Sequence, residues 1–295
     1  LALGAIIVSS KANATNLSST TRIQLESKLQ LAQANLLDAA TYFNSGIKLL
    51  EQGNYQEAIA YLTKAIENNP KLVAAYYNRA IARHQLQEYQ RAIADFTKVI
   101  QYNPSDAEAY YNRGVARNRL QDNQGAITDF TKAIEINPQD FKAYNNRGDA
   151  RLDLKDYQGA ITDFNKVIQI NPKLDIAYYN RGIARVKSRN SQAAIADFTK
   201  VIQINPNHAQ AYYNRGVARR KLKDWKAAIP DFNKAIQINP YFADAYSNRG
   251  MARGFSGDEA GGMKDLKKAI SLYQQQGESV KAQKLLEFIA IVGSK

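Results

Sequence analysis

The sequence predicts an all-α fold, a solenoid of about seven helical hairpins followed by a C-terminal capping helix. The main observation is a period, because the dipeptide Asn-Pro returns every 34 residues along most of the chain. A fixed period of this length indicates one supersecondary unit stacked many times. Each unit buries its apolar face only against its neighbours, so the 295 residues are expected to form one continuous array. The repeated dipeptides are Asn69-Pro70, Asn103-Pro104, Asn137-Pro138, Asn171-Pro172, Asn205-Pro206 and Asn239-Pro240.

The chain begins with an apolar run, Leu1 to Ser10, which is followed by Lys11 and by Ala12-Asn13-Ala14. An apolar core that ends in an A-x-A-like site is typical of a secretory signal, so residues 1–14 are interpreted as a signal-peptide remnant. The alternative is a gene fragment that begins in a helix. The visible run is too short to span a bilayer, although missing upstream residues could lengthen it into a membrane anchor. The repeats are therefore expected outside the cytoplasm, in a periplasmic or other extracytoplasmic space.

Residues 107–140 illustrate one predicted hairpin. Tyr110, Gly114 and Arg117 share one stripe of a first helix, and the polar segment Gln121–Gln124 forms the turn. The second helix ends at Asn137-Pro138, because the residue before proline avoids the helical region. The predicted units are 39–72, 73–106, 107–140, 141–174, 175–208, 209–242 and 243–276, preceded by a linker with an expected N-terminal helix over 15–38 and followed by a cap and tail over 277–295.

Small and large residues alternate between the two helices of a hairpin. Gly114 or its equivalent lies on the first helix, and Phe130 or its equivalent lies on the second. Small side chains opposite large ones let a thin helical layer reach native packing density. In the last segment, Leu285, Ile289 and Val292 share one face, as expected of a helix that covers the final hairpin.

These spacings, with an aromatic residue, then glycine, alanine, phenylalanine and proline, resemble the tetratricopeptide repeat over residues 39–276. The resemblance implies a right-handed α-α superhelix whose first helices line a concave groove. The chain departs from the family pattern at Arg113 and Arg117, where leucine and tyrosine are usual. The last unit also departs, since it carries Gly261-Gly262 in its second helix and lacks a closing proline.

One column of the predicted first helices is asparagine in every unit, with aromatic residues beside it and branched or apolar residues one turn later. In several members of the resembled family, an asparagine ladder holds an extended peptide. A carboxamide offers both a donor and an acceptor to a peptide backbone, and tyrosine adds rigid apolar area. The alternative is that each asparagine bonds only to a neighbouring hairpin. The predicted peptide-binding residues are Asn44, Asn78, Asn112, Asn146, Asn180, Asn214, Asn248, Tyr77, Tyr111, Tyr179, Tyr213, Val115, Ile183, Val217, Arg119, Lys187 and Arg220.

Two further columns are arginine, represented by Arg113 and Arg117, and they recur with an aspartate column represented by Asp129. Partly buried arginine needs a carboxylate partner, so internal ion pairs explain these columns together. Phosphate contacts are the alternative. Charges that vary between units at groove positions are the expected determinants of partner choice: Arg119, Lys187, Arg220 and Lys221 are basic, and Glu108, Asp149 and Asp153 are acidic.

The composition argues against an enzyme, a cofactor site and a metal site. The chain has no cysteine and two histidines, and it shows no glycine-rich phosphate loop or nucleophile elbow. The net charge of +13 favours acidic partners by long-range attraction. The predicted function is therefore a non-enzymatic scaffold that binds an extended peptide or a partner protein. Single-stranded nucleic-acid binding is the disfavoured alternative, and self-association into a structural scaffold is a third.

Overall fold

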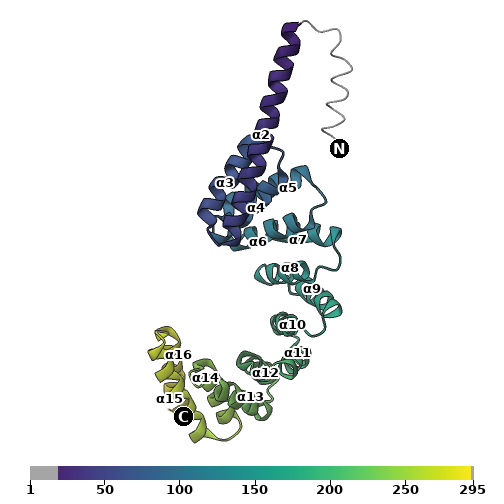
Figure 1. The fold of residues 1–295 in the computed structure, drawn as a ribbon. Helices are drawn as coiled ribbons and strands as arrows, with labels where there is room; N and C mark the ends of the chain where they lie inside the picture. Colours follow the sequence, from purple (N-terminus) through teal and green to yellow (C-terminus); the bar gives the residue numbers. More distant parts are fainter. Residues whose placement is uncertain (1–18, 294–295) are drawn as a thin grey trace. The chain divides into compact units, whose positions relative to one another are not determined.

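The computed structural model describes residues 19–293 (Figure 1). The chain divides into two compact units, which meet in sequence between Ile136 and Asn137. Every regular element within the described range is an α-helix, so the predicted all-α class is confirmed. The expected signal-peptide remnant, residues 1–14, lies outside the described residues. None of the helices between 19 and 293 combines the length and the apolar character that crossing a membrane requires.

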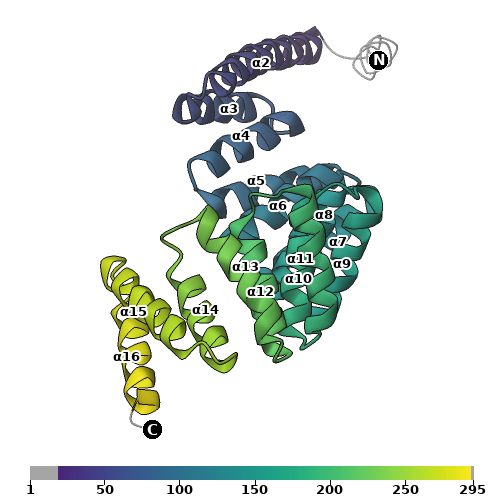
Figure 2. The ribbon, with the colours of Figure 1, turned by 90° about the horizontal axis from the view of Figure 1, so that it is seen from below.

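The first unit contains three hairpins built by successive helices that pack side by side in chain order (Figure 2). Its helices are α2 (Ser19–Glu51), α3 (Tyr55–Asn68), α4 (Val73–Gln85), α5 (Tyr89–Tyr102), α6 (Ala107–Arg119) and α7 (Asn123–Ile136). Helix α2 is continuous from the segment expected as a linker into the first hairpin, which differs from the predicted break before residue 39. The reason is local, because Ser19 to Ser45 contain neither glycine nor proline and are rich in good helix formers.

The second unit contains four hairpins and a final single helix. Its helices are α8 (Phe141–Asp153), α9 (Tyr157–Ile170), α10 (Asp175–Lys187), α11 (Ser191–Ile204), α12 (Ala209–Lys221), α13 (Trp225–Ile238), α14 (Ala243–Phe255), α15 (Glu259–Gln275) and α16 (Ser279–Gly293). Each first helix also contacts the next first helix, so α8, α10 and α12 form one continuous surface.

The Asn-Pro dipeptides form turns that separate the hairpins. In the second unit, the backbone N–H of Asn171 donates to the Val167 carbonyl and so closes helix α9. The Asn171 side-chain oxygen then accepts from the N–H of Lys173 at 3.3 Å, two residues on, which is an Asx turn around the proline. Asparagine therefore ends the helix and shapes the turn, while proline prevents the helix from continuing.

The core of the five middle hairpins is a phenylalanine against a small residue, as predicted, and Leu62 and Leu266 take the place of the phenylalanine in the first and last hairpins. Phe130 is fully buried, and a Cβ built on Gly114 would lie 2.8 Å from its Cε1 atom. In the second hairpin this column holds Ala80, which is itself buried in the same cluster as Phe96. Close approach of the two helices is thus a requirement of every hairpin, and only the smallest side chains meet it.

The last hairpin packs more tightly at its backbone than the others do. A Cβ on Gly262 would lie 2.8 Å from the Gly250 carbonyl oxygen, so the glycine that breaks the predicted pattern allows α14 and α15 to touch. Helix α16 then packs against α15, with Leu285 buried and Ile289 partly buried in the final core cluster. This arrangement agrees with a capping role for α16 within the second unit.

Candidate functional site

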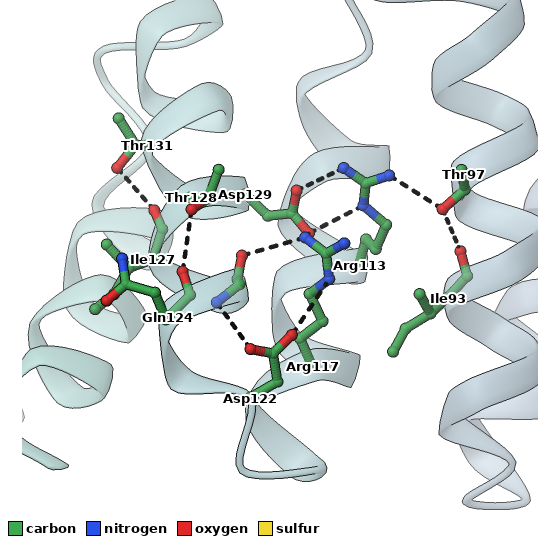
Figure 3. A network of polar contacts seen from close by, with 11 residues as sticks. Ile93, Thr97, Arg113, Arg117, Asp122, Gln124, Ile127, Thr128, Asp129 and Thr131 are labelled. Carbon is green, nitrogen blue, oxygen red and sulfur yellow. Dashed lines mark hydrogen bonds and ion pairs between the residues drawn. The ribbon is translucent and has the colours of Figure 1, made fainter. Parts of the chain in front are cut away.

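The two arginine columns face the aspartate of their own hairpin. Arg113 donates from Nη2 to Oδ1 of Asp129 at 2.7 Å and from Nε to Oδ2 at 3.0 Å, and Arg117 Nη1 donates to Oδ2 at 2.8 Å (Figure 3). Asp129 is buried, so the predicted internal ion pairs are confirmed. The same network recurs as Arg79/Arg83 with Asp95, Arg147/Arg151 with Asp163, Arg181/Arg185 with Asp197, Arg215/Arg219 with Asp231 and Arg249/Arg253 with Asp265.

The first arginine of each pair also reaches the preceding hairpin. Arg113 Nη1 donates to the Thr97 hydroxyl at 3.0 Å, and that hydroxyl donates to the Ile93 carbonyl (Figure 3). The guanidinium lies over the Tyr110 ring, 5.5 Å from its centroid. Sequence reasoning missed this acceptor, whose signal is a threonine or asparagine sixteen residues before the arginine. Asn165, Thr199 and Asn233 accept in the same way from Arg181, Arg215 and Arg249.

In the first unit, the asparagine ladder bonds across hairpins at Asn112. Asn112 Nδ2 donates to the Tyr77 hydroxyl at 2.9 Å, and that hydroxyl donates to Glu108 Oε2 at 3.2 Å. Asn78 donates instead to the Ala74 carbonyl one turn earlier. Asn44, on helix α2, is exposed. The bond from Asn112 uses one of its two N–H groups, so the carboxamide retains donor and acceptor capacity.

The second unit repeats this pattern with one variation. Asn214 donates to the Tyr179 hydroxyl at 3.0 Å, and Asn248 donates to the Tyr213 hydroxyl at 3.3 Å. The preceding hairpin carries Asn145 at the ladder position of the tyrosine, and Asn180 donates instead to Asp149 Oδ1 at 2.8 Å. These asparagines therefore bond to a neighbouring hairpin, as the alternative in the sequence analysis expected. The bonds also hold the carboxamides in fixed orientations on the first helices. Asn146 is half-buried on helix α8.

The ladder tyrosines are half-buried and lie on the core phenylalanines. Tyr77 meets Phe96 edge to face with a centroid distance of 5.7 Å. Burial raises the pKa of Tyr77 and of Tyr213 to about 12, with nearby carboxylates adding to the effect. Both hydroxyls are therefore neutral near pH 7 and can donate as well as accept. The corresponding ring pairs are Tyr111 with Phe130, Tyr179 with Phe198 and Tyr213 with Phe232.

The remaining predicted residues lie on the same first helices. Val115, Ile183 and Val217 are partly buried one turn after the tyrosines. Arg119 and Lys187 are exposed at the ends of α6 and α10. Arg220 is only half-exposed, and its Nε is buried without a hydrogen-bond partner in the described part of the chain. No group of acidic or histidine side chains between residues 19 and 293 has an arrangement that could hold a metal ion.

A pocket that sequence reasoning missed lies between α14, α15 and α16. Its volume is about 610 Å³, and Met251, Phe255, Met263 and Phe288 contribute apolar walls. Gly254 leaves open space beside this pocket, because a Cβ built on it meets no atom within 4 Å, whereas Leu152 and Val186 occupy its column in other hairpins.

Comparison with protein families identifies these hairpins. Two family models described as tetratricopeptide repeat match the chain, one over residues 43–99 and 85–141 and the other over residues 141–174, 176–208 and 209–242. Together the matches cover more than half of the sequence. The chain belongs to the tetratricopeptide repeat family. Comparison with curated proteins gives no match.

Several solved structures are similar in fold to this tetratricopeptide repeat protein. The MamA protein is 26% identical, with a TM-score of 0.55, over 58% of this chain and 94% of that one. YrrB, described as a TPR protein with an unusual peptide-binding site, is 23% identical with a TM-score of 0.55, over 64% and 97% of the two chains. The C-terminal part of a TPR repeat-containing protein from Cytophaga hutchinsonii has a TM-score of 0.70 at 19% identity, over 81% and 98%. The last two likenesses concern the fold alone.

Proposed function

We propose that this protein is a non-enzymatic scaffold that binds an extended peptide, or an extended segment of a partner protein, on its first helices. Tetratricopeptide repeat proteins typically act in protein–protein interaction. We name as the first-helix surface the columns that contain Asn214, Tyr179 and Ile183 and their equivalents in the other hairpins. The observation that carries the proposal is that these columns keep partly exposed carboxamides and rings in the hairpins before the last one, where Asn248 is buried. The alanine, phenylalanine and aspartate columns, by contrast, are buried in the core.

The chemistry of the first-helix surface suits a backbone ligand. Each cross-hairpin bond uses one N–H of an asparagine and fixes the direction of the carboxamide, as in Asn214 with Tyr179. The carboxamide oxygen and the second N–H are then preorganised for a peptide N–H and carbonyl, which reduces the entropy lost on binding. Tyrosine and branched side chains supply apolar contact area between the ladder positions.

Two substitutions that remove the same hydrogen bond distinguish a role in peptide binding from a role in hairpin stacking. Asn214→Ala removes the carboxamide and the cross-hairpin bond, whereas Tyr179→Phe removes only the hydroxyl that accepts this bond. Each change should lower the free energy of unfolding by ~1 kcal/mol, the net value of one hydrogen bond. Peptides selected by the intact protein from a random 12-residue library should bind Asn214→Ala roughly fivefold to tenfold more weakly and Tyr179→Phe within about twofold. Equal affinity losses in the two variants would show that the ladder is only structural.

The nucleic-acid alternative loses its main support in the arginine columns. Arg113 and Arg117 are engaged by Asp129 and are not available as phosphate ligands without breaking a buried network. The ladder tyrosines are half-buried against core phenylalanines, so their faces are not open platforms for stacked bases. Peptide binding is therefore the function that we favour.

A further inference from the structure

One carboxylate of the second unit departs from the rule that buried aspartates pair with arginine. Asp149, on helix α8, accepts hydrogen bonds from Asn180 at 2.8 Å and from Asn145 at 3.1 Å. No lysine or arginine among the described residues forms an ion pair with it. By contrast, Asp163 on the next helix has two arginines. The Asp149 carboxylate is thus half-buried with amide donors but without a counter-charge.

In the hairpin of Asp149, two columns of the repeat carry residues that differ from those of the next hairpins. Ile183 and Val217 occupy its column in the next two hairpins, and Asn145 stands where those hairpins carry Tyr179 and Tyr213. The Oδ1 atom of Asn145 is buried and accepts no hydrogen bond within the described range. The fold itself therefore leaves part of the hydrogen-bonding capacity of the polar side chains on α8 unused.

A complementary exception lies two hairpins later, on helix α12. Arg220 occupies the column that holds Leu152 and Val186 in the two preceding hairpins. Its Nε is buried and donates to no acceptor, and the ion pairs of the described chain do not include it. Arg220 lies two turns after the ladder tyrosine Tyr213 on α12, so it shares a helix face with the columns of the first-helix surface.

Helix α10 lies between these two unpaired charges and is apolar at the same columns. Tyr179, Ile183 and Val186 are partly buried there, and α10 contacts both α8 and α12. Packed helix axes are about 8–10 Å apart, which puts α8 and α12 roughly 16–20 Å from each other. An extended chain advances about 3.3 Å per residue, so roughly five or six residues span this separation.

We propose that the first-helix surface of the second unit recognises an extended peptide segment with one basic and one acidic side chain about five or six residues apart. The basic group binds Asp149, the acidic group binds Arg220, and apolar residues between them contact α10. Half-buried charges without partners are costly, and an oppositely charged ligand group recovers part of that cost. A segment with the signs reversed meets like charges at both ends and is rejected. This inference rests on the proposed function and specifies its ligand class.

Selection from a random 12-residue peptide library on the full chain tests the proposal. The intact protein should enrich peptides with a basic and an acidic residue at the stated spacing and with apolar residues between them. Asp149→Val restores the residue type found at Val217 and should abolish only the preference for a basic residue. Arg220→Leu restores the residue type found at Leu152 and should abolish only the preference for an acidic residue. Lys200→Ala removes an exposed charge on a second helix and should leave the selection unchanged.

Synthetic peptides then provide a charge-swap measurement. A selected peptide should lose about tenfold or more in affinity for Arg220→Glu, and replacing its acidic residue by lysine should restore most of the loss. Enriched peptides that lack the charged pair, or the same peptides from all variants, would overturn this inference and leave peptide binding intact. A library from which the intact protein enriches no peptide would overturn the proposed function together with the inference.

Discussion

A buried carboxylate that two arginines share depends on the shape of the cations as well as on their charge. Arg113 reaches both oxygens of Asp129 and also the Thr97 hydroxyl, which requires three donors in a planar fork. Lysine carries the same charge but presents a single ammonium group on a flexible stem. The arginine columns are therefore expected to tolerate very few substitutions.

Arg113→Lys should lower the free energy of unfolding by about 2–3 kcal/mol, because it leaves part of a buried charge network without hydrogen bonds. Lys132→Ala is the matched control, since Lys132 is exposed and pairs with the exposed Glu135, and it should leave the free energy of unfolding nearly unchanged. Urea unfolding followed by circular dichroism measures both values. Similar effects from the two variants would contradict the structural role assigned to Arg113.

The carboxylate of Asp149 makes stability depend on pH in a defined window. Desolvation, with a smaller contribution from Asp153, raises the pKa of Asp149 from 3.8 to about 7 in the folded chain. Below pH 4 the group is protonated in both folded and unfolded states, and its burial carries no penalty for charge. As the pH rises from about 4 to 7, the unfolded state ionises first, so the folded state loses relative stability.

Asp149→Val should remove this loss. The free energy of unfolding of the variant minus that of the intact protein should grow between pH 4 and 7, by up to ~4 kcal/mol, and stay level above pH 8. Taking the difference cancels the titration of the other carboxylates. Denaturant unfolding at a series of pH values measures it, and a difference that is flat across this window would refute the raised pKa.

At the scale of single elements, the turn inside each hairpin carries a repeated backbone conformation that sequence reasoning missed. The second residue after the end of each first helix has a positive φ, and in five hairpins it is not glycine: Gln87, Gln121, Lys155, Arg189 and Lys223 have φ between 61° and 65°. Gly53 and Gly257 occupy the same column in the first and last hairpins. A side chain in this left-handed region costs of order 1 kcal/mol, and glycine avoids that cost.

Lys155→Gly should therefore raise the free energy of unfolding by about 0.5–1 kcal/mol, even though glycine destabilises most other positions. Lys155→Ala keeps the Cβ and the strain, so it should give no gain. Guanidinium unfolding of the two variants measures the difference. A loss of stability in Lys155→Gly would mean that unfolded-state entropy outweighs the relief of strain.

Much of the element structure follows from sequence because the 34-residue period repeats each signal several times. The helical spacing, the small-to-large pairing of Gly114 with Phe130 and the Asn-Pro ends all recur, so accidental matches are averaged out. The unit boundary expected before residue 39 falls inside helix α2, because the 34-residue pattern does not extend before that residue. The Asn214 carboxamide could be assigned to the first-helix surface, but its bond to the Tyr179 hydroxyl depends on the offset between neighbouring hairpins, which the sequence pattern does not encode. Thr97 was missed for the same reason.

At the scale of the whole molecule, the net charge of +13 includes basic side chains that are not available to bind a partner. Twelve arginines are engaged with six buried aspartates, and these networks hold six of the thirteen net positive charges close to the protein core. Long-range attraction to polyanions persists, because the charge is still present. Direct phosphate contacts need mobile cations at the surface, and fewer of these remain.

Binding to a short single-stranded oligonucleotide should therefore be detectable only at low salt and should vanish near ~150 mM salt, as expected when few phosphates are neutralised. Fluorescence anisotropy across a salt series measures this. Submicromolar affinity that persists at ~150 mM salt, and that weakens when Tyr179 and Tyr213 are replaced by alanine, would favour nucleic acid over peptide as the ligand.

The arginine networks also bear on how such a chain can change in length. Arg181 makes its carboxylate bonds to Asp197 within its own 34-residue unit and only one bond, to the uncharged Asn165, with the unit before it. In Arg215 the neighbouring acceptor is the Thr199 hydroxyl, so either side chain serves. A gene that gained or lost one whole unit by unequal recombination would encode arrays in which the arginine–aspartate pairs within each unit remained complete. The repeat is thus a module that can be duplicated without compensating substitutions.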